Sequence, residues 1–390
     1  MRIVVTGLVA TYPVGGVAWD YLQYVLGFRA LGCEVYYLED TGRWVYDPIA
    51  QTFVPDVRAN AGYLARALEQ LDPALAGCWS VRASDGGYHG LDGAAVARIC
   101  AGADLFLNVS GACWLRDEYR TARVAAYLDS DPCYSQAKLA AVDAGETDRE
   151  VVNSAELIRR HDVFFTLGEH IGADDCLIPT CGLTWRPTRQ PIHLPSWPVT
   201  PGPGPDAPFT TVMSWSIEPT SPVVGGHAFG GKDVEFLRFL DLPSQTTETL
   251  EVALSGNAPR ARLTAAGWKL RDPRPVSATL DDYRRYLQGS RGELSVAKNA
   301  YVATRSGWFS TRSAAYLASG RPVVLQDTGF SRHVATGPGL HAFTTTREAV
   351  EALAAVRANH AAACAHARAV AESEFAAERV LRRLLADAGL

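Results

Sequence analysis

Residues 298–326 read KNAYVATRSGWFSTRSAAYLASGRPVVLQ and lead directly into residues 327–330, DTGF. The spacing of apolar residues predicts a helix over about 310–318 and a buried strand over 322–326. The stretch contains four basic residues and neither Asp nor Glu, although the whole chain has 42 Asp and Glu against 37 Lys and Arg and a net charge of -5. A helix that follows an acid-free loop and feeds a strand is typical of an α/β sheet with an anion site.

The remaining composition is that of a soluble globular protein. A chain of 390 residues with 47% hydrophobic and 20% charged residues is expected to form two domains. Its mild acidity argues against binding nucleic acid. None of the eight cysteines forms a CxxC pair, which argues against a zinc cluster or a disulfide framework. The excess of Arg over the four lysines suggests a GC-rich bacterial genome.

The N-terminal sequence does not have the pattern of a signal peptide. The N-terminal run MRIVVTGLVATYPVGG lacks the apolar core and cleavage site of a signal peptide. No stretch approaches the roughly 20 apolar residues of a membrane span. We therefore expect a cytoplasmic protein without a transmembrane segment, and its oligomeric state stays open.

Strands and helices alternate in the first half of the chain. Residues 2–9 predict a buried strand, and a loop with Gly15 and Gly16 leads from it into a helix over 17–31. Further strands are expected at 34–38, 104–109, 124–128 and 163–167, and further helices at 57–71 and 154–160. This order predicts a doubly wound, Rossmann-like domain with a parallel sheet.

A proline-rich segment divides the chain. Residues 187–208 carry eight of the 22 prolines, a density that neither a helix nor a sheet interior accommodates. We expect an N-terminal domain over 1–186, a linker over 187–206, a second Rossmann-like domain over 207–370, and a terminal helix over 371–390 that packs back on the first domain. Two such domains are expected to face a cleft, where ligands bind at the carboxyl ends of the strands.

In the second domain the predicted strands are 209–214, 250–255 and 322–326. The predicted helices are about 233–240, 279–288, 310–318 and 346–356, with an alanine-rich helical end over 361–388.

The start of the helix at 310–318 is the first candidate site. Ser310 or Thr311 is suited to cap the helix, and the free N–H groups of its first turn are suited to hold phosphate. Arg312 would add a forked contact to a diphosphate, and Lys298 lies at the start of the same stretch. The plainer alternative is a capped core helix with surface arginines.

The order of elements resembles that of GT-B glycosyltransferases. The closest match is residues 318–324, ASGRPVV, which resemble the end of a motif found in retaining members of that class. The two acidic residues of that motif are missing, since their positions fall at about Gly307 and Ala315. Residues 290–330 also resemble uncharacterised bacterial glycosyltransferase-like proteins. The resemblance implies that the domain over 207–370 binds a nucleoside-diphosphate sugar as donor, with Asp327, Thr328 and Gly329 near its sugar hydroxyls. It also implies that the domain over 1–186 binds the acceptor, and we expect Gly15, Gly16 and Glu169 on that side of the cleft.

A glycine-rich loop supplies further donor-side candidates. In residues 225–232, GGHAFGGK, four glycines let the backbone approach a ligand, and Lys232 begins a helix. Lys232 looks like the lysine that retaining GT-B enzymes place beside the donor diphosphate. His227 would touch the sugar or the phosphate. A flexible surface loop with an incidental histidine is the alternative.

Two aspartates are candidates for the catalytic base. Asp129 and Asp131 follow the strand at 124–128. Asp-x-Asp is also the metal signature of the GT-A fold, but the GT-B-like layout argues against a metal role. Asp131 is equally suited to cap the next helix. Asp20 lies in the helix after Gly15 and Gly16, near the place where inverting GT-B enzymes often hold a base. A solvated helix carboxylate is the alternative for Asp20.

The pair Glu169 and His170 closes the strand at 163–167 and is a secondary acid/base candidate at the cleft wall, with two surface turn residues as the plainer interpretation.

Taken together, these features predict a metal-independent glycosyltransferase, for hexosyl or related transfer, that needs no cofactor beyond the nucleotide-sugar co-substrate. The acceptor is undetermined, and so is the choice between inversion and retention. A nucleotide-sugar epimerase on the same fold is the main alternative, and a sugar-nucleotide-binding protein without catalysis is the other. We expect small-molecule partners and no nucleic acid.

Overall fold

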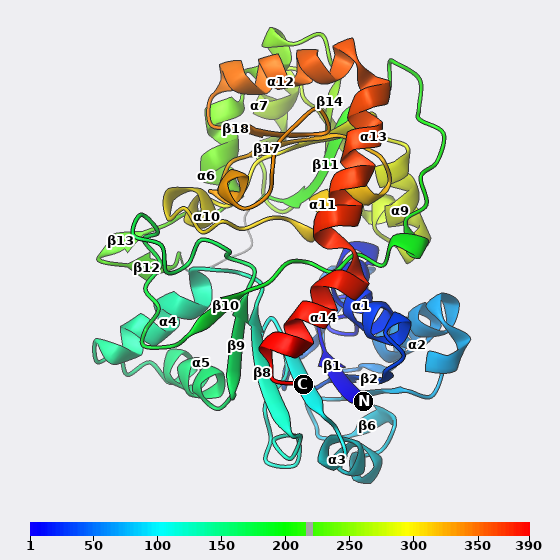
Figure 1. Ribbon diagram of the computed structural model, residues 1–390, viewed down its shortest axis with the longest axis vertical. Helices are drawn as coiled ribbons and strands as arrows, with labels where there is room; N and C mark the ends of the chain where they lie inside the picture. Colours follow the sequence, from blue (N-terminus) through cyan, green and yellow to red (C-terminus); the bar gives the residue numbers. More distant parts are fainter. Residues whose placement is uncertain (216–220) are drawn as a thin grey trace.

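The computed structural model describes residues 1–215 and 221–390. These residues form two α/β halves, one above the other in Figure 1, each built on its own largely parallel sheet. None of the described helices combines the length and the apolar character needed to cross a membrane. The predicted fold class, two Rossmann-like doubly wound units, is confirmed.

The N-terminal half contains an eight-stranded sheet in the order β10-β9-β8-β7-β1-β2-β5-β6, in which only β6 is antiparallel to its neighbour. Its strands are β1 (Arg2–Thr6), β2 (Glu34–Glu39), β5 (Trp79–Arg82), β6 (Tyr88–Gly90), β7 (Leu105–Val109), β8 (Val124–Asp129), β9 (Val163–Thr166) and β10 (Trp185–Pro187). The helices are α1 (Gly15–Ala30), α2 (Arg58–Leu71), α3 (Gly93–Ala101), α4 (Tyr134–Asp143) and α5 (Arg149–Arg159), and a separate hairpin consists of β3 (Val45–Asp47) and β4 (Thr52–Val54).

The C-terminal half contains a six-stranded parallel sheet in the order β15-β14-β11-β16-β17-β18. Its strands are β11 (Phe209–Ser214), β14 (Leu250–Ser255), β15 (Lys269–Arg271), β16 (Gly292–Ser295), β17 (Val323–Gln326) and β18 (Leu340–Phe343), and a hairpin is formed by β12 (Val223–Val224) and β13 (His227–Ala228). The helices are α6 (Lys232–Phe236), α7 (Arg260–Ala265), α8 (Pro273–Val276), α9 (Leu280–Gln288), α10 (Asn299–Ala303), α11 (Thr311–Ala318), α12 (Thr346–Ala358) and α13 (His360–Val370).

The chain crosses between the halves at two neighbouring places. The proline-rich segment crosses first, and its Ile192 pairs with Ala376 in the second crossing, after a π-helical turn at Ala371–Phe375. The terminal helix α14 (Ala377–Asp387) then packs on α1, where Leu381 lies against Gly27. Figure 1 shows α13 beside the upper sheet and α14 beside α1 in the lower half. The prolines therefore lie in an ordered crossing whose Trp197 is fully buried against Trp19, with 4.8 Å between ring centroids.

Sequence patterning located the long elements, and the structure corrects their ends. The first strand stops at Thr6 rather than residue 9, and the alanine-rich end is two helices with a π-helical turn between them. Asp131 does not cap α4, because Cys133 occupies the N-cap and Gln136 completes a capping box. The short strands β16 and β18 were not predicted.

Candidate functional site

Five charged residues from both halves gather where the halves meet. Their charges act on one another's pKa values, and Lys298 of the C-terminal half lies 2.8 Å from Asp131 of the N-terminal half. We call this group the junction cluster, and its members are Asp20, Asp131, Lys232, Lys298 and Arg312. All five were predicted from the sequence as site residues, although they lie up to 292 positions apart along the chain.

Two cations of the junction cluster have carboxylate partners. The Arg312 Nε donates to Glu293 Oε1 at 2.5 Å, and its other nitrogens donate to the carbonyl of Val212 and to the Ser295 hydroxyl. Lys298 Nζ lies 2.8 Å from Asp131 Oδ1. Because its guanidinium is held inside the C-terminal half, Arg312 does not present the free fork that the sequence suggested.

Lys232 has no such partner. It makes no ion pair or hydrogen bond with any residue in the ranges 1–215 and 221–390. Burial, together with the charges of Arg312 and Lys298, lowers the pKa of Lys232 to about 7. A lysine in this position is disfavoured as a cation until an anion approaches it.

Asp20 faces the same place from α1. Burial raises the pKa of Asp20 to about 7, while Arg312 and a hydrogen bond from Thr311 oppose the rise. Asp20 is nevertheless an exposed residue, and its contact with water limits how strongly burial acts on the carboxyl group. Thr311 is the first residue of α11, so this hydrogen bond joins the N-terminal half to the start of that helix.

The two aspartates after β8 differ in their surroundings. Burial raises the pKa of Asp129 to about 6, and the carboxylate accepts hydrogen bonds from Gln136, Ser135 and Thr166 within its own half. Burial favours the neutral form of Asp131, but the charge of Lys298 together with the hydrogen bonds from Lys298 and Tyr301 outweighs it and lowers the pKa of Asp131. Asp131 therefore acts as the fixed partner of Lys298 and of the Tyr301 hydroxyl.

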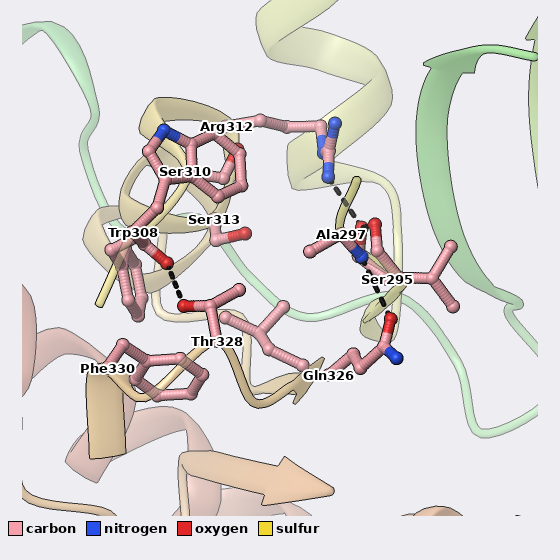
Figure 2. A pocket seen from close by; sticks show the side chains of 12 residues that line it. Ser295, Ala297, Trp308, Ser310, Arg312, Ser313, Gln326, Thr328 and Phe330 are labelled. Atoms are coloured by element: carbon pink, nitrogen blue, oxygen red, sulfur yellow. Dashed lines mark hydrogen bonds between the residues drawn. The ribbon is translucent and has the colours of Figure 1, made fainter. Parts of the chain in front are cut away.

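A hollow lies at the start of α11, between the ends of β16 and β17. Figure 2 shows its lining, with the Ser313 hydroxyl directed into the space and Trp308 and Phe330 on one side. Ser310 is the N-cap of α11 but makes no capping hydrogen bond, and Ser313 Oγ is buried without a partner among the described residues. The first turn of α11 thus presents donors to this hollow, which we call the α11 hollow.

The predicted sugar-side residues lie beside the α11 hollow. Thr328 lines it and donates to the carbonyl of Trp308. Asp327 accepts from the Gly329 and Ser331 N–H groups and from the Ser331 hydroxyl, so it caps its own turn. Gly329 has a φ of 94°, in the left-handed region.

Four other predicted residues lie away from the junction cluster or are engaged in contacts with other residues. Gly15 and Gly16 pack against the C-terminal half, where a Cβ on Gly15 would come within 2.2 Å of the Thr279 carbonyl oxygen. Glu169 forms a two-pronged ion pair with Arg189, which leaves no free acid there. His227 is exposed at the tip of the β12–β13 hairpin and contacts the Gly225 carbonyl.

Sequence reasoning missed three residues of the site: Glu293, Tyr301 and Ser313. Glu293 lies in the short segment GELS, residues 292–295, and an acidic residue there was a signal for a buried partner of a cation. Nothing in the sequence identified Arg312 as that cation. Tyr301 lies one helical turn after Lys298, a spacing that places both side chains on one face. Ser313 gave no signal beyond its place in the first turn of a helix.

The comparisons with known proteins agree with this architecture. No protein-family model matches the chain, and no curated protein matches it. Among solved structures, AviGT4, described as a glycosyltransferase involved in avilamycin A biosynthesis, matches with a TM-score of 0.53 and 14% identity over 100% of this chain and 97% of that one. Sucrose-phosphate synthase from Thermosynechococcus elongatus matches with a TM-score of 0.51 and 13% identity over 99% of both chains. An α-glucosyltransferase in complex with UDP-glucose and DNA containing an abasic site matches with a TM-score of 0.57 and 9% identity over 100% of both.

These solved structures define the class of fold. The chain has the GT-B fold of glycosyltransferases, with two Rossmann-like units and a junction between them, as the sequence resemblance implied. At identities of 9 to 14% the likeness concerns the fold, so the chemistry has to be argued from this chain's own residues.

Proposed function

We propose that this protein is a glycosyltransferase that moves a sugar from a nucleoside-diphosphate sugar to an acceptor hydroxyl without a metal ion. The observation that carries the proposal is Lys232, a half-buried cation without a partner among the described residues, whose pKa is also lowered by the charge of Arg312 in the first turn of α11. A diphosphate is the group that fits both features, because it carries charge for the lysine and several acceptor oxygens for the N–H groups.

Fold neighbours support the choice of donor. The α-glucosyltransferases that share this fold are described in complexes with UDP and with UDP-glucose. In the present chain the corresponding ligand would extend from the α11 hollow toward Lys232. The hollow holds only about 260 Å³ of empty space, part of it open to solvent, which is small for a whole nucleotide-sugar. Binding is therefore expected to widen the junction.

The cations at the junction would stabilise the leaving group. During transfer the bond between the anomeric carbon and the diphosphate oxygen breaks, and negative charge grows on that oxygen. Lys232 and the first-turn N–H groups of α11 are suited to stabilise this charge. The positive charge of Arg312, whose side chain is 10% exposed, also favours the negative charge of the leaving group. Glu293 holds the Arg312 side chain in place.

Asp20 is suited to accept the proton of the acceptor. As the acceptor oxygen bonds to the anomeric carbon, its proton has to leave, and a base with a pKa near 7 performs this step well. Thr311 holds the Asp20 carboxylate at the start of α11. Asp131 is less suited to this role because Lys298 and Tyr301 already occupy it. A base in this position implies inversion at the anomeric carbon.

The test is a screen of UDP-, GDP-, ADP- and TDP-sugars with and without a mixture of acceptors. Release of a nucleoside diphosphate that depends on the acceptor supports transfer. A new sugar isomer formed from donor alone would instead identify an epimerase, an activity that none of the observations favours. Binding without any turnover would identify a sugar-nucleotide-binding protein.

A further inference from the structure

Glu235 is a buried carboxylate one helical turn after Lys232. Its side chain is 2% exposed, and a carboxylate in such a place is stable only where donors surround it. Asn299 Nδ2 donates to its Oε1 at 2.7 Å, and Gln326 Nε2 and Arg238 Nη1 donate to its Oε2. These donors come from the start of α10, from the end of β17 and from the turn after α6, so the carboxylate joins three parts of the C-terminal half.

Asn299 extends this connection to the two glycines before Lys232. Its Oδ1 accepts from the Gly230 N–H at 2.9 Å, and its own N–H donates to the Gly231 carbonyl at 3.0 Å. The N–H of Ala300 donates to the Gly230 carbonyl at 3.1 Å. The backbone that leads into Lys232 is therefore fixed against the start of α10 by these hydrogen bonds.

The helix that begins at Lys232 needs such support. α6 is five residues long, and a helix of that length is not stable by itself. Its N-cap is Gly231, which has no side chain to cap the first turn, and glycines leave the backbone free to adopt many conformations. The position of the Lys232 side chain therefore depends on contacts made by other residues, and Glu235 and Asn299 supply them.

Gln326 connects the same carboxylate to the α11 hollow. Gln326 lines that hollow, and its Oε1 accepts from the N–H of Ala297, another lining residue, at 3.2 Å (Figure 2). A chain of hydrogen bonds thus runs from this lining through Glu235 and Asn299 to the glycines before Lys232.

We propose that Glu235 is a positioning residue that fixes Lys232 relative to the α11 hollow, so that a single diphosphate reaches both. Lys232 and the first-turn N–H groups of α11 belong to different elements, and a ligand that contacts both requires a defined spacing between them. Glu235 acts through Lys232 and does not touch the ligand. The diphosphate rests on the proposed function, whereas the effect of Glu235 on the place of Lys232 does not.

The first test needs no ligand. The chain has four lysines, which are Lys138, Lys232, Lys269 and Lys298, so lysine labelled with carbon-13 at Cε gives four NMR signals. The signal that is lost in Lys232→Met identifies this residue. In the wild type it should titrate near pH 7, because burial and the charges of Arg312 and Lys298 lower the pKa of Lys232 to about 7.

Glu235→Gln keeps the shape of the side chain but places an NH₂ group opposite the NH₂ group of Asn299 or of Gln326. Neither of these amides can turn to accept from it without losing a bond, because each uses its oxygen for a backbone N–H, that of Gly230 or of Ala297. Two facing donors are expected to push the start of α6 away from its place.

Lys232 should then titrate about 1 pH unit or more closer to its ordinary value of 10.5. The double variant Glu235→Gln/Gln326→Glu again sets a donor opposite an acceptor and should restore the wild-type titration. Glu248→Gln is the matched control, because Glu248 is also 2% exposed in the same half but pairs with Arg357. It should leave the titration of Lys232 unchanged.

The second test measures the affinity of the full chain for inorganic diphosphate by calorimetry. Glu235→Gln should weaken binding about 10-fold or more, the double variant should regain most of the loss, and Glu248→Gln should bind as the wild type does. Urea unfolding of each variant separates lost stability from a displaced Lys232. If Glu235→Gln does not fold, Asn299→Ala at a half-buried position gives the same comparison.

An unchanged titration of Lys232 in Glu235→Gln would overturn the proposal, as would an equal shift in Glu248→Gln or a wild-type value near 10.5. A shift that the double variant does not reverse would also overturn it, because the effect would then come from the lost charge. If neither inorganic diphosphate nor any nucleotide binds the wild type while Glu235→Gln still shifts Lys232, the proposed function fails and the positioning role of Glu235 stands.

Discussion

Lys232 holds a positive charge in a place that disfavours it. Its pKa falls from 10.5 to about 7, with burial as the largest cause and two neighbouring cations as the next. Such a side chain lowers the stability of the free protein and gains from a bound anion. This combination separates a binding lysine from a structural one, which would have a partner.

The Lys232→Met variant is expected to be more stable than the wild type below pH 7, by about 0.5–2 kcal/mol. The folded pKa lies below the unfolded one, so the wild-type protein gains stability as the pH rises from about 7 to 10.5. The advantage of the variant should therefore shrink over that range. Urea unfolding at pH 6 and pH 10 measures both effects. The exposed Lys269→Met is the control, and a variant less stable than the wild type at pH 6 would contradict the interpretation.

Asp20 gives a prediction about the pH dependence of turnover. A base acts only when deprotonated, so kcat should rise with pH through about 7 and then level off. Asp20→Asn should lower kcat by about 10²–10⁴-fold and remove this rise, with little effect on nucleotide affinity. Asp131→Asn is the comparison, because its paired carboxylate should leave the rise in place. An unchanged pH profile in Asp20→Asn would assign the base elsewhere.

At the residue scale, the sequence singled out the five charged side chains of the junction cluster, but it did not predict the contacts that Arg312, Lys298 and Asp131 make. Lys232 and Asp20 stood out because a lysine after four glycines and an aspartate among aromatic residues are unusual settings. The predicted forked contact of Arg312 to a diphosphate did not take account of Glu293, its ion-pair partner, which lies 19 residues earlier in another element. Glu169 was misjudged for the same reason, because Arg189 reaches it only in the folded chain.

The helix α11 is the element on which the anion site is built. Its N-cap Ser310 leaves the first-turn donors uncapped, and Ser313 Oγ is buried without a partner in the described part of the chain. Buried polar groups without partners are rare in folded proteins, and a ligand is one explanation for them.

Ser313→Ala should reduce nucleotide affinity by about 3- to 10-fold, the value of one hydrogen bond. The stability of the free protein should change by less than about 0.5 kcal/mol, because no protein hydrogen bond is lost. Ser319→Ala is a matched control, since its hydroxyl is equally buried and unpartnered but lies at the other end of α11. Titration of the nucleotide into both variants measures the two affinities, and equal losses of affinity would refute the role of Ser313.

The loop before α11 fixes this helix against the N-terminal half. Gly307 has a φ of 76°, and a Cβ there would come within 2.6 Å of the His170 backbone nitrogen. Gly307→Ala should therefore destabilise the protein by about 1–3 kcal/mol. Gly182→Ala, at a φ of 72° with nothing within 4 Å, measures the cost of the backbone conformation alone. Urea unfolding should show the larger loss for Gly307→Ala, and equal losses would mean that the close contact is unimportant.

At the element scale, prediction succeeded where apolar runs were uninterrupted. The strands at 209–214 and 250–255 were placed correctly because β-branched and apolar residues fill them. The strand β16 is only four residues long and contains Glu293, whose charge breaks the apolar pattern, and so it was missed. Short edge strands such as β15 depend on their neighbours for stability, which local patterning does not detect.

At the scale of the whole molecule, the two halves are fastened together by many contacts between distant residues. Lys298 pairs with Asp131, Trp308 donates to the Ser130 carbonyl, and His170 lies 3.0 Å from His333. These contacts join residues more than 160 positions apart. The proline-rich segment led us to predict a division there, but the contacts between the halves could not be predicted, because no local pattern encodes them.

The central proposal is that a nucleoside diphosphate binds at Lys232 and the start of α11. The direct measurement is calorimetric titration of UDP, GDP, ADP and TDP into the full chain, followed by the best binder into Lys232→Met and Lys269→Met. We predict that one nucleotide binds with a Kd on the order of micromolar, that Lys232→Met loses about 10-fold or more, and that Lys269→Met is unchanged. Equal affinity of the wild type and Lys232→Met for that nucleotide would contradict the proposal.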